Sequence, residues 1–111
     1  MIMQAHELPK GVLDAIVEVL ARNPNVQRAC LFGSRARGTA REGSDIDLCV
    51  MGRALDLDQL LELEQQLDAL DLPWKVDLLA WHLIDDPQLR ERIAQEGVTL
   101  LDRQARGQDG I

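Results

Sequence analysis

Two aspartates, Asp45 and Asp47, have the residue type and spacing that most directly suggest chemistry. They begin an apolar stretch typical of a strand, where alternate side chains face the same way, so both carboxylates are expected on one face. A Gly-Ser pair, Gly33 and Ser34, ends the preceding apolar stretch. Because Mg²⁺ takes oxygen ligands and is commonly held by one or two carboxylates plus substrate phosphates, the pattern indicates a site for Mg²⁺ and a triphosphate.

A third carboxylate is expected from Asp77, near the start of the apolar segment KVDLLAW. If Gly33 ends one strand and Asp45 begins the next, those two strands must run antiparallel to bring both residues to one rim. A helix between the second and third strands is a crossover that joins parallel strands, which places Asp77 at the same rim. The predicted topology therefore collects all three aspartates.

The hydrophobic periodicity predicts a small mixed β-sheet with helices packed on it, an α/β (α+β) fold. Pro9 and Asp86-Pro87 suit the first turns of helices, and Asp56 suits an N-cap. The expected helices cover residues 9–23, 34–39, 56–70 and 86–97, and the expected strands cover residues 26–32, 45–51, 75–81 and 98–101.

Length and charge limit the possible functions. A chain of 111 residues and 12.4 kDa is expected to form one domain over residues 1–102, without a second substrate-binding lobe, and a disordered tail over residues 103–111. The formal net charge of −7 argues against direct, sequence-independent nucleic-acid binding. With no apolar run of membrane-spanning length and no secretory signal, we expect a cytoplasmic protein without membrane contact.

Charged and thiol side chains near the aspartates have competing interpretations. Arg35 and Arg37 suit phosphate because guanidinium matches phosphate oxygens bidentately, although both could be solvated charges or partners of Glu42. Cys30 and Cys49 lack the paired spacing of a zinc site and are interpreted as small core residues in a reducing compartment.

The segment GSRARGTAREGSDIDL, together with Asp77 on a later strand, resembles the nucleotidyltransferase superfamily that includes DNA polymerase β. That superfamily has Gly-Ser, ten residues, Asp-x-Asp, and then a third acidic residue. The segment is similar in particular to the minimal nucleotidyltransferases, small prokaryotic proteins paired with a helical HEPN partner in toxin–antitoxin modules. The resemblance covers about residues 10–101.

The resemblance implies the nucleotidyltransferase fold and a set of site residues. Asp45, Asp47 and Asp77 would be catalytic and would bind Mg²⁺, with two ions expected. The residues implied to bind the nucleotide are Gly33, Ser34, Arg35, Arg37 and Ser44. The implied reaction transfers a nucleoside monophosphate, AMP from ATP in our prediction, to a hydroxyl of a HEPN-type partner protein.

Two other functions stay open. One is an antitoxin that neutralises its partner by occlusion without catalysis. The other is nucleotidyl transfer to a small molecule. The aminoglycoside nucleotidyltransferases resemble this chain around the motif, but they carry an additional substrate-binding domain that is not expected here. The sequence does not specify the nucleotide, the acceptor atom or the oligomeric state, and a homo-oligomer remains open.

Overall fold

The computed structural model describes residues 8–41 and 43–103, so the predicted tail beyond residue 103 and the predicted role of Glu42 lie outside the described residues. Four strands form one sheet in the order β3-β2-β1-β4. The elements follow one another as α1 (Lys10–Ala21), β1 (Arg28–Phe32), α2 (Ser34–Arg37), β2 (Ile46–Met51), α3 (Leu57–Asp68), β3 (Val76–Ala80), the 3₁₀ helix η1 (Trp81–Leu83), α4 (Pro87–Glu96) and β4 (Val98–Asp102).

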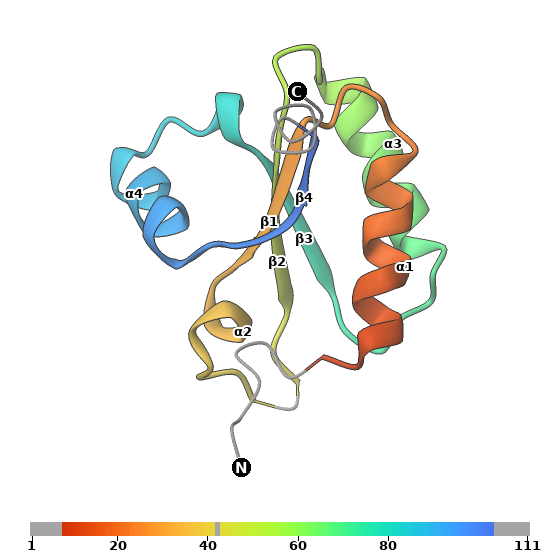
Figure 1. Ribbon diagram of the computed structural model, residues 1–111, viewed down its shortest axis with the longest axis vertical. Coiled ribbons are helices and arrows are strands. Elements are labelled where there is room, and N and C mark those ends of the chain that lie inside the picture. The colour runs from red at the N-terminus through yellow and green to blue at the C-terminus, as the bar shows by residue number, and fades with distance from the viewer. Residues whose placement is uncertain (1–7, 42, 104–111) are drawn as a thin grey trace, which may run out of the picture.

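The sheet is mixed, as predicted from the sequence. β1 pairs antiparallel with β2 and with β4, and β3 pairs parallel with β2 after the α3 crossover. The end of β1 therefore lies at the same rim as the starts of β2 and β3, beside α2 (Figure 1). This arrangement confirms the predicted fold class.

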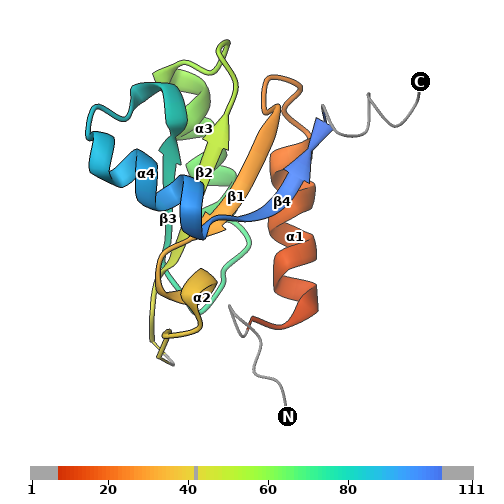
Figure 2. The same ribbon diagram turned by 60° about the vertical axis from the view of Figure 1, so that its left-hand side comes forward.

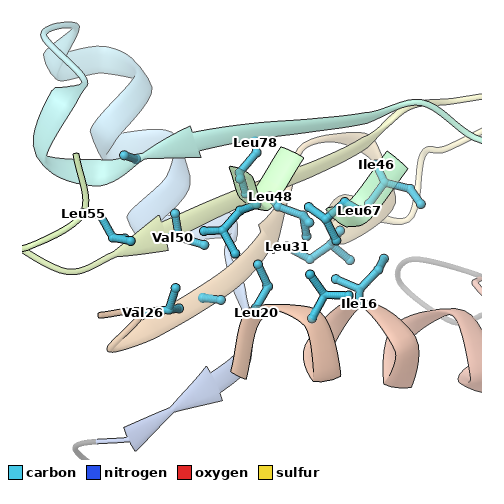
Figure 3. Packing of buried hydrophobic residues seen from close by; sticks show 14 of the residues in the cluster. Ile16, Leu20, Val26, Leu31, Ile46, Leu48, Val50, Leu55, Leu67 and Leu78 are labelled. Atoms are coloured by element: carbon cyan, nitrogen blue, oxygen red, sulfur yellow. The ribbon is translucent and has the colours of Figure 1, made fainter. Parts of the chain in front are cut away.

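One face of the sheet carries the larger hydrophobic core. The helices α1 and α3 lie side by side on this face and bury Ile16, Leu20 and Leu67 against Leu31 and Leu48 (Figures 1 and 3). These five side chains are at most 2% exposed. Since burying one such side chain contributes about 1.5–3 kcal/mol, this face supplies the main stabilisation of the sheet.

The other face carries α4 and a smaller core (Figures 1 and 2). Ile93 from α4 packs with Cys30 and Phe32 of β1 and with Cys49 of β2. Residues two apart on a strand share a face, so Asp47 projects on the same side as Cys49. The carboxylate face is thus the face that α4 partly covers.

Both predicted helix caps are present. The Asp56 carboxylate accepts a hydrogen bond from the amide of Gln59 at 2.8 Å, and the Asp86 carboxylate accepts one from the amide of Gln88 at 2.9 Å. Each cap satisfies an amide that a helix start leaves without an intrahelical partner. Pro87 follows at the first helical position, where its missing N–H costs nothing.

Several boundaries differ from the sequence prediction by one or more residues. Asp45 precedes β2 instead of beginning it, and Trp81 belongs to η1 instead of β3. Arg103 was predicted to start the tail, but its guanidinium donates hydrogen bonds to the carbonyl oxygens of Val26 and Ala21 at 2.7 and 2.6 Å. Arg103 thus joins the folded part because it satisfies carbonyls near the end of α1. Within the described ranges, no helix is both long and apolar enough to cross a membrane.

Candidate active site

A row of paired residues crosses three strands at the rim beside α2. Asp47 on β2 stands opposite Phe32 on β1 and opposite Asp77 on β3. Paired residues on neighbouring strands point to the same face, so the carboxylates of Asp47 and Asp77 are neighbours. The predicted convergence of two sequence-distant aspartates is therefore present in the fold.

Gly33 follows this row and has a conformation that requires glycine. Its φ is +78°, and a Cβ built on it would lie 2.3 Å from Oδ2 of Asp47. A side chain at position 33 would collide with the carboxylate and strain the backbone. The Gly33 carbonyl then accepts hydrogen bonds from the amides of Ala36 and Arg37, both at 3.0 Å, and these bonds fix α2 beside Asp47.

The Asp47 carboxyl is electrostatically unfavourable as an anion. The pKa of the Asp47 carboxyl is raised above its usual value, mainly by partial burial and to a smaller extent by the negative charges of Asp77 and Asp45. The positive charge of Arg37 lowers this pKa. Desolvation and like charges both disfavour an ionised carboxyl, and a bound cation would reverse both effects. A positive ligand at the row would therefore stabilise the ionised form of Asp47.

Asp45 is not part of the paired row. It is exposed, precedes β2 and affects Asp47 through its charge. Across residues 8–41 and 43–103, no three His, Cys, Asp or Glu side chains lie close enough together to hold a metal ion as they stand. The predicted three-carboxylate cluster is thus incomplete in this conformation, which is consistent with like-charge repulsion between carboxylates.

Lys75 is a further charged residue at the rim. Its Nζ lies 3.8 Å from Oδ1 of Asp77, and its carbonyl accepts a hydrogen bond from the amide of Ile46 at 2.8 Å. The Lys75 and Asp77 side chains are 73% and 44% exposed, so water screens the ion pair. Lys75 places a positive charge beside Asp77, where a metal cation would also be attracted.

A cleft of about 650 Å³ opens along the row. Its lining includes the predicted residues Gly33, Ser34, Arg37, Asp47 and Asp77. Arg37 forms an ion pair with Glu96 of α4 at 3.1 Å, which links the two helices on either side of the cleft. The cleft therefore places a cation from α2 within the same space as the two paired carboxylates.

Two predicted nucleotide-binding residues are not part of this lining. Arg35 is 3% exposed, and its guanidinium donates to the Ser44 carbonyl oxygen at 2.8 and 3.1 Å and stacks 5.3 Å from the centre of the Trp74 ring. The Ser44 hydroxyl accepts a hydrogen bond from the amide of Arg41 at 2.8 Å. These contacts hold the loop between α2 and β2, so Arg35 and Ser44 position the site from outside the cleft.

Three further side chains at the site were not identified from the sequence. Glu64 of α3 and Arg92 of α4 line the cleft, and Lys75 lies beside Asp77. Lys75 could have been found from strand periodicity, since it precedes Asp77 by two residues. Glu64 and Arg92 carry no local signal, because only the packing of α3 and α4 brings them to the cleft.

The donors at the row fit a hard divalent cation. Asp47 and Asp77 offer carboxylate oxygens, which Mg²⁺ and Mn²⁺ prefer. Burial, and after it the charges of Asp77 and Asp45, raise the pKa of Asp47, and a bound cation would oppose this shift. Among the described residues that line the cleft, none offers a thiol or an imidazole. The cleft therefore suits a softer metal less well than Mg²⁺ or Mn²⁺.

Known proteins share both the sequence pattern and the fold. Residues 14–106 match the family described as polymerase beta, nucleotidyltransferase. A Methanocaldococcus jannaschii protein, assigned by inference as a protein adenylyltransferase, is 38% identical over 78% of this chain and 90% of its own length. The probable protein adenylyltransferase MntA of Haemophilus influenzae is 35% identical over 66% of this chain and 64% of its own length.

Solved structures agree with the sequence matches. A chain in a crystal structure of a toxin–antitoxin with AMP-PNP has a TM-score of 0.70 and 33% identity, and the match covers 85% of this chain and 76% of that one. A chain in the complex of the tri-AMPylated Shewanella oneidensis HEPN toxin with its MNT antitoxin has a TM-score of 0.66 and 27% identity, with 89% and 76% covered. The protein described here belongs to the polymerase β nucleotidyltransferase family and is a minimal nucleotidyltransferase.

Proposed function

We propose that this nucleotidyltransferase transfers AMP from ATP, in the presence of Mg²⁺, to a hydroxyl of a HEPN-type partner protein, and that it is thereby the antitoxin of the pair. The observation that carries the proposal is the parallel pairing of Asp47 with Asp77 beside Gly33. The relatives named as protein adenylyltransferases and the structural matches to toxin–antitoxin complexes support the acceptor and the partner.

The proposal assigns the metal to the carboxylates. Asp47 and Asp77 would hold Mg²⁺ from neighbouring strands, and Asp45 would complete the site by a small movement of the segment before β2. When bound, Mg²⁺ neutralises phosphate charge and orients the triphosphate for in-line attack. The pKa of Asp47, raised by burial and then by the charges of Asp77 and Asp45, favours this assignment, since a bound cation would stabilise the ionised carboxyl.

The proposal assigns the triphosphate to the part of the cleft formed by Gly33 and the residues of α2. Gly33 leaves space that a side chain would fill, Ser34 offers a hydroxyl, and Arg37 offers a guanidinium that can donate two parallel hydrogen bonds to a phosphate. Arg92 of α4 would add a second positive charge from across the cleft. Positioning and charge stabilisation are the main contributions that a protein makes to phosphoryl transfer.

The remaining role is that of a base near the attacking hydroxyl. The Asp77 side chain is 44% exposed, and its Oδ1 lies 3.8 Å from Nζ of Lys75, so an acceptor can approach this carboxylate from solvent. We assign Asp77 to accept the proton of the attacking hydroxyl. The proposed acceptor is a hydroxyl that the surface of a second protein holds in line with the triphosphate.

Intact-mass spectrometry of the partner tests the proposal. Incubation of a HEPN-type partner with this protein, ATP and Mg²⁺ should add one or more units of about 329 Da, the mass of a transferred AMP. The matched controls are EDTA and Asp47→Asn, which should both prevent the addition. A partner that is neutralised without any gain of mass would exclude the enzymatic proposal and favour occlusion.

A further inference from the structure

Cys30 and Cys49 form a facing pair directly behind the active-site row. They are register partners on the antiparallel strands β1 and β2, two pairs along the sheet from Phe32 and Asp47. Both are free thiols, 5% and 0% exposed, and they pack together in the core beneath α4. No part of the proposed nucleotidyl transfer uses either thiol.

The backbone geometry suits a disulfide at this position. Residues directly opposite on antiparallel strands have Cα atoms about 4.5–5.5 Å apart, and disulfides join Cα atoms about 4.4–6.8 Å apart. The pairing of β1 with β4 shifts in register between Ala29 and Cys30. Such an irregularity loosens the strand ladder locally, so β1 can adjust at Cys30 without breaking its pairing with β2.

A small oxidant can reach one of the two sulfur atoms. A cavity of about 300 Å³ between the sheet and α4 is lined by Cys30, together with Trp81, Ile93 and Gly97. A Cβ built on Gly97 would lie 3.2 Å from Sγ of Cys30, so the glycine leaves the approach to this sulfur open. A hydrogen bond with the Cys49 thiol lowers the pKa of Cys30, with burial acting against the shift and the charge of Arg28 supporting it.

We propose that Cys30 and Cys49 are a site of reversible oxidation, at which a peroxide converts the facing thiols into an intramolecular disulfide. The Cys30 sulfur attacks one peroxide oxygen, the O–O bond breaks, and Cys30 sulfenic acid and water form. The Cys49 sulfur then attacks the sulfenic sulfur and displaces the hydroxyl as a second water. The two thiols lose two electrons and the peroxide gains them, so two thiols and hydrogen peroxide give one disulfide and two waters.

The disulfide would close a covalent loop around the active-site segment. Gly33, Ser34, Arg37, Asp45 and Asp47 all lie between the two cysteines in the sequence. Linking the ends of this segment restricts the unfolded chain and therefore stabilises the folded one. Because the strands are already paired in the register that the bond needs, we expect the disulfide to form in the folded protein and to stabilise this segment.

Thiol labelling of the native protein tests the proposal, and the result is simple to interpret because the chain has two cysteines. After exposure to dilute hydrogen peroxide, the protein is quenched, denatured and treated with a maleimide. We expect both thiols to be lost, no intermolecular dimer to form, dithiothreitol to restore both labels, and the melting temperature of the oxidised protein to rise by about 5 °C or more.

The variants Cys30→Ser and Cys49→Ser are the matched controls. Each removes one partner with little change of volume, so neither should gain thermal stability on oxidation. Peptide mapping of the oxidised unsubstituted protein identifies the bond directly and does not depend on either variant folding. The proposal fails if the native protein keeps both labels under peroxide that oxidises the urea-unfolded protein, or if oxidation lowers the melting temperature.

Discussion

Asp47 on β2 stands directly opposite Asp77 on β3, and this parallel pairing is the relationship on which the active site depends. Residues 48–76, including the whole of α3, separate the two carboxylates in the sequence, yet the strand register makes them neighbours. The pair concentrates negative charge in a cleft that Arg37 also lines. Its electrostatic cost and its ability to bind a cation therefore have the same origin.

Replacing Asp47 with Asn should stabilise the metal-free protein at neutral pH. The pKa of Asp47 is raised in the folded protein, so its contribution to stability is fully present below its unfolded pKa of about 3.8 and is lost as the pH rises through the folded pKa. The variant should melt a few degrees higher than the unsubstituted protein at pH 7 without divalent ions. This difference should disappear as the pH falls toward the unfolded pKa.

The control for this change is Asp85→Asn, because Asp85 is an exposed residue before α4 and away from the carboxylate row. At pH 7 without divalent ions, its melting temperature should lie close to that of the unsubstituted protein, as is usual for a surface substitution. Thermal melts across pH measure both variants. Equal melting temperatures for Asp47→Asn and the unsubstituted protein throughout would contradict the raised pKa.

Replacing Gly33 with Ala should abolish nucleotide binding and destabilise the protein by about 1–3 kcal/mol, the usual cost of a strained backbone at positive φ. The new Cβ would lie 2.3 Å from the Asp47 carboxylate and would force the two apart. Gly43→Ala is the matched control, since a Cβ on Gly43 meets nothing within 4 Å. Calorimetric titration with ATP and Mg²⁺ should separate the two variants.

Arg35 and Arg37 should respond differently to substitution, although they are two residues apart. Arg35→Met removes buried hydrogen bonds to the Ser44 carbonyl and should lower the free energy of unfolding by about 1–3 kcal/mol, as measured with urea. Arg37→Met removes an exposed charge at the cleft and should weaken ATP binding while changing stability little. Equal losses of stability in the two variants would contradict their assignment to different roles.

Replacing Lys75 with Gln should raise the affinity for Mg²⁺ or Mn²⁺ in the absence of nucleotide. The Lys75 ammonium lies 3.8 Å from Asp77 and competes with a metal for the same carboxylate. The ion pair is exposed, so its contribution is at most about 1 kcal/mol and the gain in affinity should not exceed roughly fivefold. Titration with Mn²⁺ followed by electron paramagnetic resonance measures this gain, and a weaker affinity would show that Lys75 supports the site.

The sequence alone was sufficient to identify the motif and the topology. Strand periodicity placed Asp47 on a defined face, and the connection through α3 required a parallel pairing that brings Asp77 to the same rim. The caps at Asp56 and Asp86 were also predictable, because capping depends on residues adjacent in the chain. In each case the determining interaction is local or follows from chain connectivity.

The tertiary structure decided which of the charged residues face the cleft. The sequence grouped Arg35 with Arg37, but the first is buried against Ser44 and Trp74 while the second lines the cleft. It gave no indication of Arg92, which α4 brings across the sheet. The direction of a side chain in a short helix or loop depends on the space and hydrogen-bond acceptors that distant segments supply, and these exist only once the chain has folded.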